Sequence, residues 1–355
     1  MNVKIVIGAN YGDEGKGLVS GCLAREAKAN GEKSLTVFYN GTCQRAHTFE
    51  NEVHRCMAAG TSYGSDTFYH RQFVIDPISI FLFQAKPIID GECRVVLPCD
   101  VVRNRKLETE RGPERHGSCG FGLFEAVKRC KMDPDNAVKA KDLLDAWSLY
   151  DKLRRNEQRY GAFSDDLYNM HYFMLAADYI RKNCTIKSFT DTVKGYDTVI
   201  FEGGQGLLLD QGNRDCFPHL TPSSTGNTLI ADDVKSLGVA PELFYVSRSY
   251  ITRHGNGPME SECGKNEINP AIVDKTNITN EFQGELRFGR IDMSSLVDRV
   301  KKDANVYDQK KVNMVFTHLN YTNGLINTTD GLKPVSCGTF DGVYVSDQKD
   351  YFDKL

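Results

Sequence analysis

The sequence predicts an α/β fold built on one large, mostly parallel sheet flanked by helices. Continuous apolar runs of strand length recur along the chain, as in strands that are buried on both faces of a parallel sheet. Segments with helical spacing alternate with these runs, so that residues 3–7, 18–29 and 35–39 form a strand, a helix and a second strand. We find no internal repeat, low-complexity tract or linker. Residues 1–355 are therefore predicted to form a single domain with inserted subdomains.

The remaining elements follow from the same patterns. Further strands are predicted at residues 94–97, 198–201, 243–246 and 314–317, and further helices at 143–154, 166–183 and 294–304. The strongly charged stretch from Asp100 to His116 is predicted to be a solvated excursion from the sheet.

Composition limits the class of protein. The 44 Lys and Arg nearly balance the 47 Asp and Glu, which argues against a protein that clamps duplex nucleic acid through its phosphates. No apolar run reaches the roughly 18 residues of a membrane span, and the start of the chain shows no signal peptide. The 11 cysteines include no CxxC pair, so we expect reduced thiols and not a disulfide framework or zinc ribbon. A cytoplasmic enzyme is expected.

The most informative segment is the glycine-rich loop of residues 8–17, GANYGDEGKG, between the first strand and the first helix. Four glycines, Lys16 and a helix N-terminus favour a bound phosphate. The loop is not a Walker A motif, because Gly17 stands where a Ser or Thr would hold Mg²⁺. Asp13 is the nearby candidate for the metal. The alternative is a surface glycine turn, and the loop lacks the G-x-G-x-x-G spacing of a dehydrogenase.

Residues 12–17 resemble the nucleotide loop of the adenylosuccinate synthetase family, and further blocks resemble that family in the same order. These blocks are residues 46–48 (AHT), 117–122 (GSCGFG), 202–210 (EGGQGLLLD), 217–221 (FPHLT) and 252–258 (TRHGNGP, where the family has Val at the position of His254). The resemblance extends from Val3 to about Asn320. It implies a P-loop-like nucleotide-binding ligase fold.

The resemblance also implies a reaction in which L-aspartate is condensed with a 6-oxopurine nucleotide, driven by a nucleoside triphosphate. Asp13 would be the base that removes the N1 proton, and His47 would assist phosphoryl transfer to the purine oxygen. Lys16 and Mg²⁺ would neutralise the triphosphate, with Asp13 and Ala46 as the metal ligands. The family forms homodimers that lend an arginine across the interface, and Arg129 is the candidate here.

The other site residues implied by the resemblance fall into three groups. The nucleotide-binding group is Gly12, Glu14, Gly15, Gly17, Ala46, Thr48, His318 and Asn320; the purine monophosphate group is Gln44, Ser118, Cys119, Gln205 and Thr221; the aspartate group is Arg287 and Arg290. Glu285 stands where the family has a cation, which makes the aspartate group the weakest match.

Three departures from the family bear on the substrate. The chain is shorter, and Gln44, Arg45 and Cys119 alter the purine pocket. Asn320 stands where the family has an Asp that accepts two hydrogen bonds from guanine. Because an Asn amide pairs better with adenine, ATP or dATP is expected as phosphate donor.

These departures resemble a phage branch of the family, which converts dGMP into N6-succino-2-amino-2'-deoxyadenylate for diaminopurine DNA. Such an enzyme would act in the host cytoplasm. Some members of that branch carry Ser at the position of Asp13, so the retained Asp keeps IMP open as the substrate. A nucleotide-binding regulatory protein without ligase activity is the alternative from another class.

Overall fold

A computed structural model describes residues 1–43, 46–50, 52–161, 166–273, 282 and 284–335, together with the backbone of 338–340 and 343–347. Within this part of the chain, ten strands form one sheet in the order β18-β19-β15-β11-β1-β10-β2-β5-β7-β9. All neighbours in this sheet are parallel except β18 and β19, so the predicted α/β fold with a large, mostly parallel sheet is confirmed.

The strands of the main sheet are β1 (Asn2–Gly8), β2 (Ser34–Phe38), β5 (Asp66–Tyr69), β7 (Ile88–Ile89), β9 (Thr185–Ile186), β10 (Thr198–Gly206), β11 (Glu242–Arg248), β15 (Lys311–Thr317), β18 (Gly338–Phe340) and β19 (Val343–Asp347). Smaller sheets are formed by β3 (Ala46–Phe49) with β4 (Glu52–Arg55), β6 (Val74–Ile75) with β8 (Arg94–Val95), β12 (Ile251–Arg253) and β13 (Glu262–Cys263) with β14 (Arg287–Gly289), and β16 (Leu325–Thr328) with β17 (Gly331–Pro334). The α-helices are α1 (Lys16–Ala29), α2 (Pro77–Leu82), α3 (Pro98–Arg111), α4 (Leu123–Met132), α5 (Ala146–Tyr160), α6 (Met170–Asn183), α7 (Phe189–Val193), α8 (Ala231–Ser236), α9 (Lys265–Ile268) and α10 (Met293–Ala304).

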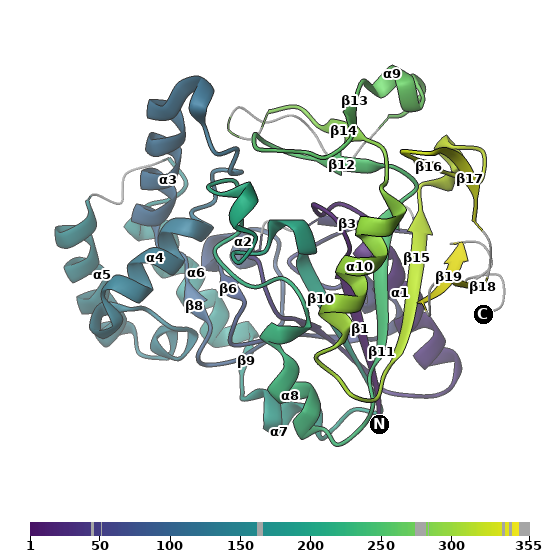
Figure 1. The fold of residues 1–355 in the computed structure, drawn as a ribbon. Coiled ribbons are helices and arrows are strands. Elements are labelled where there is room, and N and C mark those ends of the chain that lie inside the picture. Colours follow the sequence, from purple (N-terminus) through teal and green to yellow (C-terminus); the bar gives the residue numbers. More distant parts are fainter. Residues whose placement is uncertain are drawn as a thin grey trace.

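The central strand β1 shows why the apolar runs are continuous. Ile5 and Ile7 pack into the core that includes Leu296 and Val300 of α10, whereas Val6 packs against α1 from the other side. Both faces of the strand are thus buried, so apolar residues follow one another along it and do not alternate with polar ones. Figure 1 shows α10 and α1 on opposite faces of the sheet.

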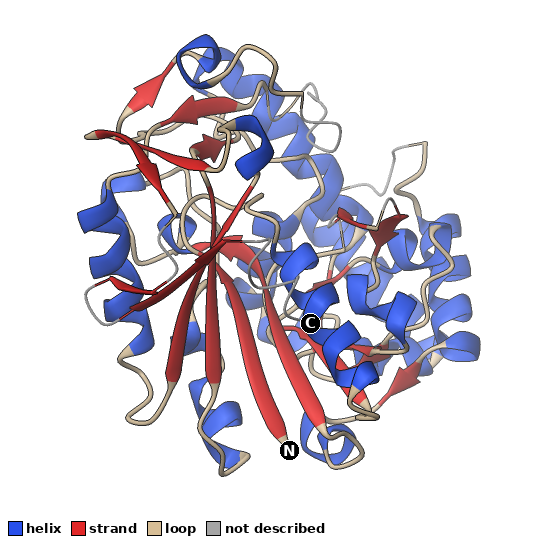
Figure 2. Ribbon diagram, turned by 90° about the vertical axis from the view of Figure 1, so that its right-hand side faces the viewer, coloured by secondary structure: helices blue, strands red, loops and turns tan. Residues whose placement is uncertain are grey.

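Two further groups of elements flank the sheet. Helices α3 to α6 gather beside the β10 side of the sheet, and the small β12-β14-β13 sheet with α9 lies above the ends of β11 and β15 (Figures 1 and 2). The N-terminus lies at the opposite end of the sheet from that small sheet. Since β1 starts at the N-terminus, the carboxyl ends of the parallel strands point toward the small sheet.

The predicted elements at residues 3–7, 35–39, 198–201, 243–246 and 314–317 are confirmed as strands of the main sheet, and those at 18–29, 166–183 and 294–304 as helices whose ends shift by up to four residues. Two predictions were less accurate. The helix expected at 143–154 begins at Ala146, where Asp145 caps it, and continues to Tyr160. The strand expected at 94–97 is only Arg94–Val95 and pairs with β6 outside the main sheet.

The prediction of a solvated excursion after Asp100 was wrong. This stretch is the helix α3, on which Asp100, Asn104 and Glu108 are buried at four-residue spacing. Asp100 accepts hydrogen bonds from Arg129 at 2.9 Å, and Glu108 accepts one from the Gly117 amide at 2.9 Å. The polar residues thus form the inward face of the helix, because each finds a partner there.

Two expectations from composition can be compared with the structure. No helix in the described residues is long and apolar enough to span a membrane. The described cysteines are free thiols and most of them are buried, as expected for small apolar side chains.

Candidate functional site

A cavity of about 820 Å³ lies at the carboxyl ends of the central parallel strands. The glycine loop after β1 forms its floor, together with residues that follow β2, β10, β11 and β15. In the sheet, β1 lies between β10 and β11. Strands β2, β5 and β7 follow on the β10 side of β1, whereas β11 and β15 lie on its other side, so the strand order reverses at β1. Open α/β sheets bind ligands at such a point, where the strand order reverses.

The carbonyl groups of the glycine loop are held by side chains from three different elements. Arg299 of α10 donates to Ala9 O at 2.9 Å, Arg248 of β11 to Asp13 O at 2.7 Å, and Thr317 of β15 to Glu14 O at 2.6 Å. No acceptor is found among the described residues for the amides of Gly15, Lys16 and Gly17, which open α1. The loop therefore presents N–H groups at a helix N-terminus, as an anion site requires.

Glu14 and Lys16 differ in their relation to this cavity. The Glu14 side chain is buried, accepts from the amides of Asn10 and Gly12 at 3.0 and 2.8 Å, and pairs with Lys16 Nζ at 3.0 Å. Lys16 lines the cavity and Glu14 does not. The Glu14 side chain thus stabilises the loop, and nucleotide binding by the Glu14 backbone stays a prediction. Gly12, Gly15 and Gly17 line the cavity as expected.

His47 lies on β3 and faces the same cavity. Its Nδ1 lies 3.0 Å from Glu202 Oε1, a carboxylate of β10 that is completely buried and also accepts from Ser20 Oγ. The contact is close, but it is not aligned as a hydrogen bond. Nδ1 therefore faces the protein, and Nε2 is the nitrogen left for a ligand.

The His47 ring packs directly against Gly17, where no side chain stands in its way. A Cβ at residue 17 would lie 2.3 Å from His47 Nδ1, so a side chain there would displace the ring. This explains physically why the loop lacks the Ser or Thr of a Walker A motif.

Asp13 lies in the left-handed region, with φ 60°, and its half-exposed carboxylate lines the cavity. His254, directly after β12, places its Nε2 3.5 Å from Asp13 Oδ2. Asp13 and His47 therefore line one cavity above the glycine loop, although 34 positions separate them in sequence.

Unpaired polar atoms gather around this cavity. Eight buried side-chain nitrogen or oxygen atoms in the described residues have no hydrogen-bond partner, and five of them belong to residues that line the cavity: Thr42, His47, Thr221, Arg253 and His254. Buried polar groups are rarely left without partners. Such a concentration shows that the polar side chains around this cavity are less completely hydrogen-bonded than those in the rest of the described chain.

The residues expected to bind the monophosphate form another part of the wall. Ser118, Cys119, Gln205 and Thr221 all line the cavity. Asn104 of α3 donates to Ser118 Oγ at 2.9 Å, which ties this loop to the charged helix. Gln44 lies outside the described residues.

The two arginines expected to bind aspartate are engaged elsewhere. Arg287 pairs with Glu262 and donates to the carbonyls of Gly255 and Gly257 at 3.1 and 2.8 Å. Arg290 pairs with Glu267 at 2.9 Å. Neither residue lines the cavity. Binding of aspartate by Arg287 and Arg290 therefore stays a prediction, and it would require them to leave these carboxylates.

Of the remaining residues expected to bind the nucleotide, some line the cavity and one does not. Ala46, Thr48 and His318 line it, whereas Asn320 is exposed in the turn after β15 and does not. Reading of the base by Asn320 therefore stays a prediction.

Sequence reasoning missed several residues of the site. Glu202 lay within a recognised block but was not singled out, and only the fold places it against His47. Arg248, Arg253 and His254 also line the cavity, as do Asn104, Glu108 and Arg111 of α3. For Asn104, Glu108 and Arg111, the available signal was their spacing of four and three residues, which places them on one face of a helix.

Arg129, the candidate for a residue shared across a dimer interface, is buried within its own chain. Its guanidinium pairs with both oxygens of Asp100 at 2.9 Å and donates to Val95 O at 2.9 Å. That expectation is wrong, because the side chain has no free donor surface to offer a partner.

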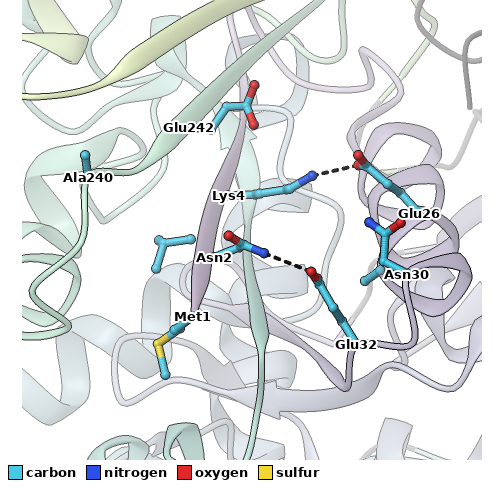
Figure 3. Close-up of a pocket in the computed structure, with 10 residues that line it drawn as sticks. Met1, Asn2, Lys4, Glu26, Asn30, Glu32, Ala240 and Glu242 are labelled. Carbon is cyan, nitrogen blue, oxygen red and sulfur yellow. Dashed lines mark hydrogen bonds and ion pairs between the residues drawn. The ribbon is translucent and has the colours of Figure 1, made fainter.

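A second, smaller pocket of about 350 Å³ lies at the amino ends of β1 and β11 (Figure 3). Its charged groups are paired with each other: Lys4 Nζ lies 2.7 Å from Glu26, and Asn2 donates to Glu32 at 3.1 Å. Because it lies at the amino ends of the strands, opposite the end where open α/β sheets bind ligands, it is not a candidate active site.

The donor set near the glycine loop fits a magnesium ion that is bound through a nucleotide. No group of three or more His, Cys, Asp or Glu side chains suited to a metal occurs among the described residues. Mg²⁺ needs only one or two carboxylates when phosphates and water supply its other ligands. The half-exposed Asp13 carboxylate and the Ala46 backbone in the cavity wall meet that requirement.

Comparison with known proteins agrees with this geometry. The adenylosuccinate synthetase family model matches residues 5–301, which include the glycine loop, β3, β10 and β12. The chain belongs to the adenylosuccinate synthetase family. Members of this family are carbon–nitrogen ligases.

Curated members of the family are distant from this chain. The adenylosuccinate synthetase of Prochlorococcus marinus (strain MIT 9313) is 25% identical over 303 residues, and that of Brevibacillus brevis is 27% identical over 294 residues. These matches cover 76% and 74% of this chain but only 66% and 65% of the relatives, so the chain matches about two thirds of their length.

Two solved structures share the fold. A fully ligated adenylosuccinate synthetase from Plasmodium falciparum superposes with a TM-score of 0.72 at 19% identity, covering 98% of this chain and 85% of that one. The succinoaminodeoxyadenylate synthetase of cyanophage S-2L, bound to dGMP and to dATP as an energy donor, superposes with a TM-score of 0.57 at 17% identity, covering 89% and 84%.

Proposed function

We propose that the protein is a ligase that condenses L-aspartate with dGMP at the expense of ATP or dATP, giving N6-succino-2-amino-2'-deoxyadenylate. The observation that carries the ligase activity is the placement of Asp13, His47 and Lys16 around one cavity above the glycine loop. A phosphate loop alone would suit many nucleotide-binding proteins. A carboxylate and an imidazole beside that loop suit proton removal and phosphoryl transfer.

The chemistry divides into two steps. Asp13 removes the N1 proton of the purine, and the O6 atom attacks the γ-phosphorus, so that an O–P bond forms and the nucleoside diphosphate leaves. The amine of aspartate then attacks C6, and the C6–O6 bond breaks with release of phosphate. Each of these leaving groups departs with its bonding electrons, and the proton of the amine is lost to the site.

The residues of this chain divide the work of the first step. The glycine loop amides and Lys16 hold the triphosphate, and His47 Nε2 lies free to meet the transferring phosphoryl group because Nδ1 faces Glu202. Mg²⁺, held by Asp13 and Ala46, would neutralise phosphate charge. The buried Glu202 carboxylate orients the imidazole.

The choice of dGMP rests on this chain's departures from the family and on the cyanophage neighbour that was solved with dGMP and dATP. Asn320 supports an adenine nucleotide as donor, and the altered purine pocket supports dGMP as acceptor. IMP is the second candidate substrate, since Asp13 is retained and the curated relatives are adenylosuccinate synthetases. We also propose a homodimer and action in the cytoplasm.

Phosphate release tests this function. The protein is incubated with Mg²⁺, ATP, aspartate and either dGMP or IMP, and phosphate is measured over time. We expect release only when dGMP and aspartate are both present. Release with IMP alone as acceptor would move the assignment to an ordinary adenylosuccinate synthetase. Release without any acceptor would contradict a ligase.

The same assay tests the base. Asp13→Asn should reduce kcat by at least about 100-fold, as loss of a general base does, while the thermal unfolding curve stays that of the wild type because Asn tolerates the left-handed backbone at this position. Substantial turnover by this variant would remove Asp13 from the role.

A further inference from the structure

The imidazole of His254 is the side chain nearest to the Asp13 carboxylate for which the structure gives a contact. Its Nε2 lies 3.5 Å from Asp13 Oδ2, and His254 is nine-tenths buried. No hydrogen bond to either carboxylate oxygen of Asp13 occurs among the described residues, since Arg248 donates to the backbone carbonyl of Asp13.

The other ring nitrogen of His254 has no partner. Nδ1 is buried and makes no hydrogen bond. A buried unpaired polar atom costs about 1–3 kcal/mol, whereas an apolar side chain at this position would carry no such cost. Retaining the imidazole is therefore unfavourable for folding unless its Nε2 side serves the site.

The lack of a partner at Nδ1 also favours one tautomer. A proton on Nδ1 would be a buried donor without an acceptor, so the proton is favoured on Nε2, where Asp13 can accept it. In structures without substrate, catalytic hydrogen bonds are often long and shorten in the complex. The 3.5 Å contact has this character.

The backbone around His254 is rigidly held. A Cβ at Gly117 would lie 2.5 Å from the Gly255 Cα, so the two loops touch through glycines. Arg287 donates to the carbonyls of Gly255 and Gly257. A side chain on such a support can fix the orientation of its neighbour.

We propose that His254 is a positioning residue that holds the Asp13 carboxylate in the orientation needed to remove the purine N1 proton. This inference rests on the proposed function of Asp13.

Matched variants of His254 test the effect of its N–H donor separately from the effect of the size of its ring. His254→Gln keeps an N–H donor at the reach of Nε2, His254→Asn ends one bond short of it, and His254→Val fills the space without a donor. His171→Gln on the exposed face of α6 is the control. The assay measures kcat and KM with dGMP, ATP and aspartate, and the melting temperature of each variant with and without dGMP reports folding and binding.

We expect kcat to fall roughly 10- to 100-fold in His254→Val and His254→Asn, to stay within about fivefold in His254→Gln, and KM for dGMP to change less than about threefold. Wild-type kcat in all three variants would overturn the inference, as would equal losses in Gln and Val or a rise in KM with kcat unchanged. A wild-type protein that releases no phosphate with any acceptor would refute the proposed function itself.

Discussion

At the scale of single residues, the site depends on close approaches that leave no room for an added atom. Gly17 is the clearest case, because it contacts the His47 ring from the first turn of α1. Its role is steric. The local sequence around the loop does not predict which side chain packs against Gly17.

Gly17→Ala should therefore lower kcat by roughly 100-fold, since a catalytic group displaced by about 1 Å can lose that much. The added Cβ would lie 2.3 Å from His47 Nδ1 and force the ring away. Helix stability should not suffer, because Ala is the better helix former by about 1 kcal/mol. Steady-state phosphate release and a thermal unfolding curve measure the two effects.

Gly195→Ala is the matched control, since a Cβ there would meet its nearest atom, Thr192 O, at an ordinary 3.7 Å. If both variants keep wild-type kcat, His47 is not held in the way that the structure indicates.

Glu202→Gln tests the partner of His47. The amide keeps the shape of the buried carboxylate and can still accept from Ser20, but it removes the charge that lies 3.0 Å from His47 Nδ1. A general acid contributes about 100- to 10,000-fold, and we expect loss of its orientation to lower kcat by roughly 10- to 100-fold. KM for ATP should change little. An unchanged kcat, measured beside a wild-type melting temperature, would mean that Glu202 serves the fold alone.

At the scale of elements, helix α3 is the part of the fold that decides the cavity wall. Asp100 begins the helix by accepting from the Leu97 amide at 2.8 Å and also pairs with Arg129 of α4. Burial alone would lower the pKa of Arg129, but the Asp100 carboxylate outweighs it and raises that pKa. The charged face of α3 is thus part of the core, and it carries Asn104, Glu108 and Arg111 to the cavity.

Arg129→Met should lower the free energy of unfolding by roughly 3–5 kcal/mol, because it leaves the Asp100 carboxylate buried and unpaired. Urea unfolding at neutral pH measures the loss. Adding Asp100→Asn to this variant should restore part of the stability, since the double variant buries no lone charge.

Lys106→Met on the exposed face of α3 is the control, with an expected change below about 1 kcal/mol. A loss in Arg129→Met no larger than that in the control would contradict the structural account of α3.

At the scale of the whole molecule, ligand binding should be coupled to stability. The cavity joins the ends of β1, β10, β11 and β15 with the loops before α4 and after β12. A ligand bound there stabilises the folded state by RT ln(1 + [L]/Kd), about 2.7 kcal/mol at 100 times Kd. For a chain of this length, that corresponds to a rise in melting temperature of roughly 4 °C.

We expect dGMP to raise the melting temperature at lower concentrations than IMP does, with AMP as the control without a 6-oxo group. Differential scanning fluorimetry measures the three curves. Stronger stabilisation by IMP than by dGMP would favour the ordinary family substrate.

The sequence by itself determined the sheet's central strands, the phosphate loop and the family, because these follow from local order: apolar runs, glycine spacing and blocks in sequence. Asp13, Lys16 and His47 were found in this way, and all three line the cavity.

Only the tertiary structure decided which side chains meet. It turned Glu14 into the loop, paired Arg287 and Arg290 with Glu262 and Glu267, and placed Glu202 against His47 and His254 against Asp13. These partners lie from a few to more than two hundred residues apart along the chain. Their contacts depend on strand order and on the space left at single glycines, and neither is written in a local sequence pattern.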